Sequence, residues 1–240
     1  MTKNFAHRGF SAAYPENTML AFQKAYETGC HGLEMDVHLS RDGVPVILHD
    51  ETVDRTTNGS GWVFDLTAQQ LRELDASYRF AGQMGHNPIP TLEEVLDWAK
   101  DTGLILNLEL KTNVNPYPGI EKTVIDLVCR FGMRERVILS SFNHETLLRC
   151  KELAPDIPCG ALTESWIVDF HRYLAALGIE CAHPEHWYLT DDHIALLKEK
   201  GIRINTWTVN DPAIMQRLIE KEVEILITNH PDVLHRLLQP

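Results

Sequence analysis

Two segments of this 240-residue sequence place charged side chains two residues apart. Glu34 and Asp36 form one pair, and Glu109 and Lys111 form the other. Residues two apart in a strand project from the same face, so each pair would point to one side of a sheet. Carboxylates that converge from neighbouring strands supply the oxygen ligands that a hard divalent cation requires. We therefore predict that Glu34, Asp36 and Glu109 bind one cation, either Mg²⁺ or Ca²⁺.

A histidine ends each of two other short apolar runs. These residues are His7, which is followed by Arg8, and His49. An imidazole titrates near neutral pH and can serve as a general acid or base. Arg8 and Lys111 contribute +2 and the three carboxylates −3, so the set carries −1, and a divalent cation would change this to +1. A site of that charge complements the single negative charge of a phosphodiester.

The elements that must position these residues are visible in the hydrophobic pattern. Short β-branched runs alternate with longer stretches of helical period, which predicts repeated βα units and a parallel sheet. The turn Asp42-Gly43 favours a hairpin in which 44–49 returns beside the second run. The runs of the main sheet are 4–7, 32–39, 104–111, 137–140, 159–162, 179–182, 202–208 and 225–228.

These eight units predict a closed barrel. Eight units in 240 residues average about 30 residues each, the size of a minimal βα crossover. The fold class is therefore α/β, a (β/α)8 TIM barrel, with an open doubly wound sheet as the alternative. Active sites of such barrels lie at the carboxyl ends of the strands, which is where the charged residues and histidines described above occur.

One segment interrupts this rhythm. Residues 51–90 are rich in Thr, Asn, Gly and Asp and contain one short helical stretch at 67–74. They follow the second strand and its hairpin, so we predict a small inserted cap segment within a single domain of residues 1–240. Thr91-Leu92-Glu93-Glu94 has the spacing of a capping box and begins the next helix. His38 is expected to be a solvated residue at the hairpin turn.

The overall charge restricts the range of partners. The chain has 22 Lys and Arg against 34 Asp and Glu, a formal net charge of −12 at pH 7. This charge disfavours nucleic acid and anionic membranes, so any phosphate must be bound by a local set of cations. No stretch approaches the roughly 20 apolar residues of a membrane span, and the first residues do not resemble a signal peptide, so we expect a cytoplasmic protein. The five cysteines have no C-x-x-C spacing, which disfavours a zinc site.

Short motifs extend over nearly the whole chain in a specific order. They are His7-Arg8-Gly9, Pro15-Glu16-Asn17-Thr18, Glu34-x-Asp36-Val37, His49-Asp50, Asp54-Arg55-Thr56-Thr57-Asn58-Gly59, Asn107-x-Glu109-x-Lys111, Ser140-Ser141-Phe142, Trp207-Thr208-Val209-Asn210 and Thr228-Asn229. Together they resemble the glycerophosphodiester phosphodiesterase family in its bacterial cytoplasmic type. The family fold is a (β/α)8 barrel with an inserted cap, which agrees with the fold predicted from the strand runs.

The resemblance implies a role for each matched residue at the centre of the site. Glu34, Asp36 and Glu109 would bind the metal ion. His7 and His49 would be the catalytic acid–base pair. The chain would then be a phosphoric diester hydrolase that depends on one divalent cation.

The resemblance also implies how substrate is bound. Arg8 and Lys111 would hold the non-bridging phosphate oxygens. Glu16 and Asn17 would support the loop after the first strand, and Trp207 would form a wall on the alcohol side of the pocket.

Other positions matter less in this comparison. Asn229 stands where the family often has Asp, and this departure is expected to affect only the far rim of the site. His183, His186 and Trp187 follow the sixth strand run, and we interpret them as a packed loop.

The expected reaction is metal-dependent hydrolysis of glycerophosphodiesters such as glycerophosphocholine and glycerophosphoethanolamine. The products would be sn-glycerol 3-phosphate and the free alcohol. Which histidine is the acid, and whether water or the glycerol 2-hydroxyl attacks phosphorus, are both left open at this stage, as is the oligomeric state. A lysophospholipase-D-like enzyme acting on lipid is one alternative, and a phosphate-binding barrel without catalysis is a more remote one.

Overall fold

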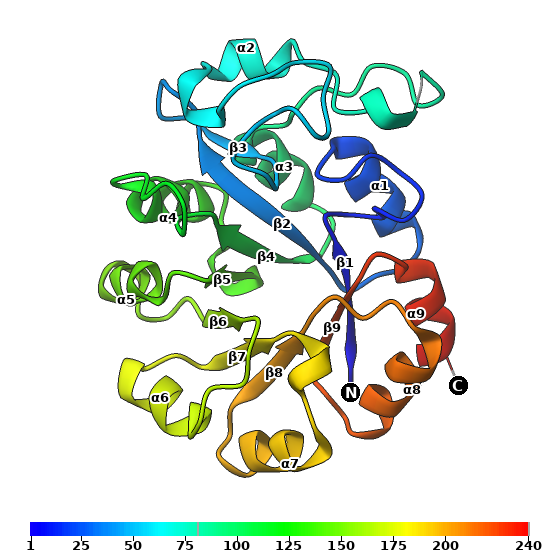
Figure 1. Cartoon of the computed structure of the whole chain (residues 1–240), viewed down its shortest axis with the longest axis vertical. Helices are drawn as coiled ribbons and strands as arrows, with labels where there is room; N and C mark the ends of the chain where they lie inside the picture. The colour runs from blue at the N-terminus through cyan, green and yellow to red at the C-terminus, as the bar shows by residue number, and fades with distance from the viewer. Residues whose placement is uncertain (81, 240) are drawn as a thin grey trace.

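Eight parallel strands close into a barrel in the computed structural model, which describes residues 1–80 and 82–239 (Figure 1). The order around the barrel is β1-β9-β8-β7-β6-β5-β4-β2, and β2 pairs with β1 to complete the ring. Strand β3 extends the sheet beyond β2 as an antiparallel hairpin partner. The strands are β1 (Lys3–His7), β2 (Gly32–Leu39), β3 (Pro45–Ile47), β4 (Ile105–Leu110), β5 (Val137–Ser141), β6 (Cys159–Thr163), β7 (Cys181–Pro184), β8 (Arg203–Thr206) and β9 (Ile225–Thr228). The TIM-barrel prediction is confirmed.

Helices cover the outside of the barrel between successive strands (Figure 1). They are α1 (Met19–Glu27), α3 (Leu92–Ala99), α4 (Ile120–Arg130), α5 (His144–Leu153), α6 (Phe170–Leu177), α7 (Asp191–Glu199), α8 (Pro212–Glu220) and α9 (Pro231–Leu238), with 3-10 turns η3 (Arg134–Arg136) and η4 (His186–Tyr188). The predicted capping box is present, because Thr91 accepts from the backbone N–H of Glu94 and the Glu94 carboxylate accepts from that of Thr91. No helix in the described ranges is long and apolar enough to cross a membrane.

The barrel interior is divided into an apolar floor and a charged upper layer. On β4, Leu106, Leu108 and Leu110 are buried in the apolar core that the helices share with the sheet. The alternate residue Ile105 instead packs in a separate cluster, whose buried members are Phe5, Ile138, Ile225 and Ile227. Period-two alternation then places the polar residues of the same strand above this floor, toward the carboxyl ends of the strands.

Residues 51–80 and 82–90 form a unit beside the hairpin, at the top of Figure 1. The unit contains η1 (Val63–Asp65), α2 (Ala68–Arg72) and η2 (Tyr78–Phe80). It has a small core of its own, made with residues of the hairpin: Val46, Leu48, Val53, Val63, Leu71, Ala76 and Ile89. This core fixes the unit to the end of β2 and β3.

Two histidine predictions need correction. His38 is not solvated at the hairpin turn but fully buried within β2, where the Tyr117 ring packs edge-on against it. Its Nδ1 lies 3.0 Å from the Tyr117 hydroxyl, and burial lowers its pKa to about 4. His183 belongs to β7 and not to a loop, and it is also fully buried. Of the three residues interpreted as a packed loop, Trp187 is the exposed one.

Candidate active site

A cavity of about 320 Å³ opens at the carboxyl ends of the strands. Seven of the residues predicted from the sequence line it: His7, Arg8, Glu34, His49, Glu109, Lys111 and Trp207. The rest of the lining consists of residues to which the sequence analysis gave no role: Glu51, Asn107, Asn113, Phe142, Leu162, Glu164 and Ile227. The position of Asn107 two residues before Glu109 is a signal that could have identified it.

The pairing of β2 with β4 brings the carboxylates together. In this register Asp36 lies opposite Glu109, and Glu34 lies opposite Asn107. One carboxylate oxygen from each of Glu34, Asp36 and Glu109 lies within 4.8 Å of the other two. All three residues are buried. The strand register therefore creates an oxygen cluster of the size that a single cation can bind.

The electrostatics of this cluster favour a bound cation. Burial raises the pKa of Glu34 well above its ordinary value, and the neighbouring charges of Asp36 and Glu109 raise it further. Burial also raises the pKa of Glu109. Burial opposes ionisation of Asp36 as well, but Arg8 and Lys111 outweigh it and hold the pKa of Asp36 below its usual range. Three buried oxygen donors with too little positive charge around them fit a hard divalent ion.

A strained turn after β1 positions Arg8. Its φ of 54° and the φ of 77° at Gly9 both lie in the left-handed region. A Cβ at Gly9 would lie 2.7 Å from the backbone of Ala21, so the turn requires glycine there. The backbone N–H of Arg8 donates to Glu34 Oε2 at 3.1 Å, and its Nε lies 3.4 Å from Asp36 Oδ2. Strain of this kind is typical of functional sites.

Lys111 is the second cation of the site. Its Nζ donates to Glu109 Oε1 at 2.9 Å and lies 3.6 Å from Asp36 Oδ1. Burial alone would lower the pKa of Lys111, but the two carboxylates outweigh burial and raise it above its ordinary value. The ammonium group therefore remains charged at the wall of the cavity.

Glu16 and Asn17 contact the residues of the site from behind the cavity lining. Asn17 Nδ2 donates to Asp36 Oδ2 at 2.9 Å. Glu16 Oε1 accepts from Arg8 Nη1 at 3.0 Å. Asn17 thus holds the Asp36 carboxylate in position, and Glu16 holds the Arg8 guanidinium. Asp36 itself also lies behind the cavity lining.

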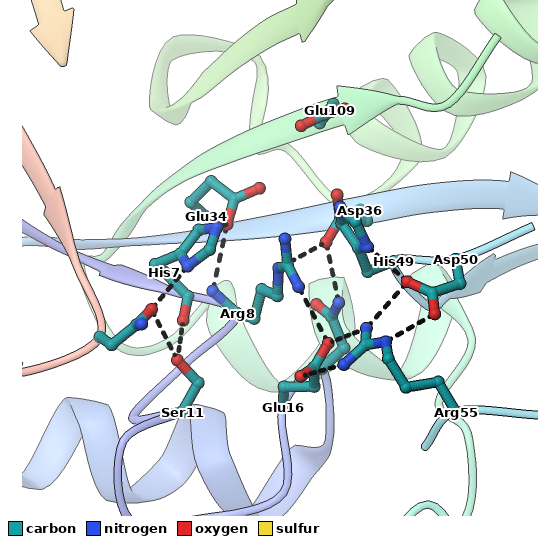
Figure 2. Close-up of polar contacts among 12 residues, drawn as sticks. His7, Arg8, Ser11, Glu16, Glu34, Asp36, His49, Asp50, Arg55 and Glu109 are labelled. Carbon is teal, nitrogen blue, oxygen red and sulfur yellow. Dashed lines mark hydrogen bonds and ion pairs between the residues drawn. The ribbon is translucent and has the colours of Figure 1, made fainter. Parts of the chain in front are cut away.

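Each cavity histidine is held through its Nδ1 atom (Figure 2). His7 Nδ1 lies 2.6 Å from Asn229 Oδ1, and His49 Nδ1 lies 2.6 Å from Asp50 Oδ1. Both partners are oxygen acceptors, so each ring donates its Nδ1–H and leaves Nε2 available to substrate. The Nε2 of His7 lies 3.8 Å from Glu34 Oε2. Burial, with a smaller effect of nearby Arg8, lowers the pKa of His7 to about 3.

Asn229 does not lie at the far rim of the site, contrary to the expectation from the sequence. Strands β1 and β9 are neighbours in the closed ring, so the residue after β9 reaches the end of β1. Its Oδ1 contacts His7 and also accepts from Ser11 Oγ at 3.0 Å. The place where this chain differs from the family pattern is therefore in direct contact with a histidine of the cavity.

An aromatic pair forms the apolar part of the cavity wall. Trp207 Nε1 donates to the carbonyl oxygen of His183 at 2.8 Å, which fixes the indole. Its ring meets Phe142 edge-on, with 5.5 Å between ring centroids. Leu162 and Ile227 complete this wall. The cavity thus combines a charged side with a smaller apolar side.

Comparisons with known proteins find relatives that cover nearly the whole chain. Residues 7–233 match the model of the glycerophosphoryl diester phosphodiesterase family. A glycerophosphodiester phosphodiesterase from Caldanaerobacter subterraneus is 38% identical over 234 residues, which cover 98% of this chain and 96% of that protein. One from Bacillus altitudinis is 37% identical over 97% of this chain and 96% of its own length. Among solved structures, a phosphodiesterase from Oleispira antarctica in complex with the product sn-glycerol-3-phosphate is 27% identical, with a TM-score of 0.88 over 99% of this chain and 97% of that chain.

Proposed function

This chain belongs to the glycerophosphoryl diester phosphodiesterase family, and from that premise we propose that it hydrolyses small glycerophosphodiesters with the aid of one divalent cation. Glycerophosphocholine and glycerophosphoethanolamine are the proposed substrates, and sn-glycerol 3-phosphate and the alcohol are the products. The observation that carries this proposal is the convergence of two histidines, two cations and a carboxylate cluster on one cavity.

Glu34, Asp36 and Glu109 would hold the cation, Mg²⁺ or Ca²⁺, because they form an all-oxygen, buried cluster. When bound, such an ion neutralises charge on the phosphoryl oxygens and so stabilises the transition state. With all five groups ionised and no ion bound, the cluster and its two neighbouring cations have a formal charge of −1, which disfavours binding of the substrate anion. The cluster is therefore the first requirement of the proposed reaction.

Arg8 and Lys111 would bind the non-bridging phosphate oxygens. Both charged groups line the cavity, and both are anchored by carboxylates that keep them at its wall. A guanidinium offers planar, paired donors to phosphate, and an ammonium offers a compact charge. The two groups would thereby hold the diester beside His7 and His49, which line the same cavity.

His7 and His49 would move the protons of the reaction through Nε2. One ring accepts the proton of the attacking hydroxyl as its oxygen bonds to phosphorus. The other ring donates a proton to the alcohol oxygen as its bond to phosphorus breaks. Attack by water and attack by the glycerol 2-hydroxyl, which gives a cyclic phosphate first, both satisfy this proton balance.

The shape of the cavity favours a small, polar substrate over a lipid. Most of its lining is charged or amide, and the apolar side is limited to Phe142, Leu162, Trp207 and Ile227. Of the described residues in 51–90, which we propose as a family-type insertion within one domain, Glu51 alone lines the cavity. The chain therefore offers an acyl group little surface at the site, and selectivity should come from hydrogen bonds to the glycerol hydroxyls.

A substrate panel tests this proposal. We expect glycerophosphocholine and glycerophosphoethanolamine to be hydrolysed with kcat/KM values within about tenfold of each other, or roughly 1.4 kcal/mol. Bis(p-nitrophenyl) phosphate and lysophosphatidylcholine should be much poorer substrates. Release of sn-glycerol 3-phosphate would be measured with Mg²⁺, Ca²⁺ or EDTA. Faster turnover of lysophosphatidylcholine than of glycerophosphocholine would replace this proposal with a lipid-cleaving activity.

A further inference from the structure

Arg55 connects two residues of the cavity lining, His49 and Arg8, through two carboxylates (Figure 2). Its Nε donates to Asp50 Oδ2 at 2.6 Å and its Nη2 to Asp50 Oδ1 at 2.8 Å. Its Nη1 donates to Glu16 Oε2 at 2.9 Å, and Nη2 also donates to Glu16 Oε1 at 2.7 Å. Asp50 in turn contacts His49, and Glu16 contacts Arg8. The Arg55 guanidinium therefore links His49, through Asp50, to Arg8, through Glu16.

The guanidinium of Arg55 satisfies both carboxylates at once, which few side chains can do. Its planar fork carries five N–H donors, and four hydrogen bonds to two carboxylates use most of them. The side chain of Arg55 is 30% exposed, and those of Glu16 and Asp50 are 23% and 26% exposed. At such partial burial, two adjacent carboxylates without a shared cation would repel each other.

The neighbours of Arg55 in the chain anchor it to the insertion. Val53 is fully buried in the small core of the insertion, and Thr56 and Thr57 are buried beside Arg55. Thr57 Oγ1 donates to the carbonyl oxygen of Val53 at 2.7 Å, which closes the turn that carries Arg55. The one direct contribution of this turn to the site is thus the Arg55 side chain, which reaches back toward the barrel.

We infer that Arg55 is a positioning residue for the reaction. It holds Asp50 against His49 Nδ1 and Glu16 against Arg8, so that the proton-transfer group and the phosphate-binding group keep a fixed separation. This inference rests on the proposed function, in which His49 and Arg8 act on the same phosphodiester. The inference also gives the insertion a role in the reaction, because the insertion carries Arg55 to the carboxyl ends of the barrel strands.

Removal of Arg55 should affect both binding and turnover. We expect Arg55→Ala to lower kcat/KM for glycerophosphocholine by about 10²-fold, because a displacement of about 1 Å at a reacting group has that effect. Arg55→Lys should be intermediate, since an ammonium cannot bridge two carboxylates as a fork. Arg72→Ala is the matched control: it removes another arginine of the insertion and its ion pair with Glu94. An exposed ion pair contributes little, so this control should change kcat/KM by no more than about twofold.

Two further variants test the Asp50 contact and the Glu16 contact of Arg55 separately. Asp50→Asn should mainly lower kcat, and Glu16→Gln should mainly raise KM, whereas Arg55→Ala should do both. The double variant of Arg55→Ala with Asp50→Asn should have nearly the kcat of Arg55→Ala alone, because the same contact is lost twice. Independent, multiplicative losses would show that Arg55 does not act through Asp50. Millimolar guanidinium should partly restore Arg55→Ala and leave Arg72→Ala unchanged.

A spectroscopic measurement tests the connection without any substrate. Nitrogen-15 NMR of the histidine rings, recorded at alkaline pH on the neutral imidazole, should show His49 with its proton on Nδ1 in the unchanged protein and a mixture of tautomers in Arg55→Ala. If the unchanged protein does not hydrolyse glycerophosphocholine, the proposed function fails, and the tautomer shift still decides the role of Arg55. Unchanged tautomer and unchanged kcat/KM in Arg55→Ala would overturn the inference. Thermal melts identify any variant that is unfolded, and Arg55→Lys then carries the same measurements.

Discussion

The two histidines of the cavity are supported by different surroundings. His7 stands at the junction of the first and last strands, where its Nδ1 meets the neutral amide oxygen of Asn229. His49 stands where the hairpin meets the insertion, and its Nδ1 meets the carboxylate of Asp50. Burial and hydrogen bonds to His49 and Arg55 act on that carboxylate, and the hydrogen bonds prevail and lower the pKa of Asp50. One ring is therefore paired with a charge and the other with a dipole.

This difference predicts that one ring is the general base of the reaction and the other the general acid. A carboxylate stabilises positive charge on the ring that it contacts, whereas an amide oxygen does so much less. His7 is in addition held in its neutral form, since its pKa is lowered to about 3 by burial and by Arg8. We therefore expect His7 to receive a proton from the nucleophile and His49 to deliver one to the leaving alcohol.

The largest expected effect comes from the carboxylate cluster, which both histidine regions share. Glu34→Gln should lower activity by at least about 10⁴-fold, because several kcal/mol of charge stabilisation depend on the bound cation. EDTA should have the same effect on the unchanged enzyme, and a divalent cation should reverse it. Full activity after exhaustive dialysis against EDTA would show that the reaction needs no metal ion.

The same variant should behave in the opposite way in a stability measurement. The pKa of Glu34 is raised in the folded state, so the folded metal-free protein binds this proton more tightly than the unfolded chain does, and its stability falls as pH rises above about 4.3. Glu34→Gln removes that loss. In EDTA at pH 7 its Tm should exceed that of the unchanged protein by a few degrees, roughly 2–4 °C per kcal/mol, with the difference shrinking toward pH 4. A lower Tm at pH 7 would contradict the argument.

The dependence of kcat on the leaving group tests which histidine is the general acid. His7→Ala and His49→Ala should each lose about 10²- to 10⁴-fold in kcat on glycerophosphocholine. A glycerophosphodiester with a p-nitrophenol leaving group needs little protonation, so His49→Ala should regain much of its loss on that substrate while His7→Ala does not. The ratio of kcat on the two substrates is the measurement. The reverse pattern would exchange the roles, and equal losses on both substrates would remove the distinction.

Replacing the carboxylate at His49 by an amide, or the amide at His7 by a carboxylate, should make the two rings more alike in proton transfer. Asp50→Asn should lower kcat by about 10- to 10²-fold, because the amide supports a charged ring less well. Asn229→Asp places a carboxylate against His7 and should raise the pKa of that ring. The pH profile of kcat/KM should therefore change on its acidic side in Asn229→Asp. An unaltered profile would mean that Asn229 has no influence on proton transfer.

At neutral pH the smallest effect is expected from a buried histidine outside both regions. His183 Nδ1 has no hydrogen-bond partner within residues 1–80 and 82–239, and burial lowers the pKa of His183 to about 3. As the pH falls, the unfolded chain therefore binds this proton before the folded protein does. The free energy of unfolding keeps the whole contribution of neutral His183 above about pH 6.5, and below that pH it decreases by up to about 1.4 kcal/mol per pH unit. His183→Gln should reduce this acid slope in urea titrations, and the exposed control His86→Asn should not. Identical slopes would exclude His183 as a source of acid sensitivity.

Much of this protein can be predicted from local patterns. Strand runs with period two and helical stretches with period 3.6 predict the barrel, because βα units of this size close in a limited number of ways. The same period two places Glu34 with Asp36, and Glu109 with Lys111, on inward faces. These are statements about neighbours in the chain, and the structure agrees with them because strand geometry alone decides them.

Contacts between distant segments depend on the tertiary structure instead. Asn229 lies 222 residues from His7 and touches it because closure of the ring makes the last strand a neighbour of the first. Arg55 meets Glu16 because the insertion folds on its own small core and turns one side chain back. His38 is buried because Tyr117, 79 residues further along the chain, packs its ring edge-on against the imidazole. Local spacing determines which face a side chain occupies, but register, ring closure and packing of the insertion decide which distant atom it meets.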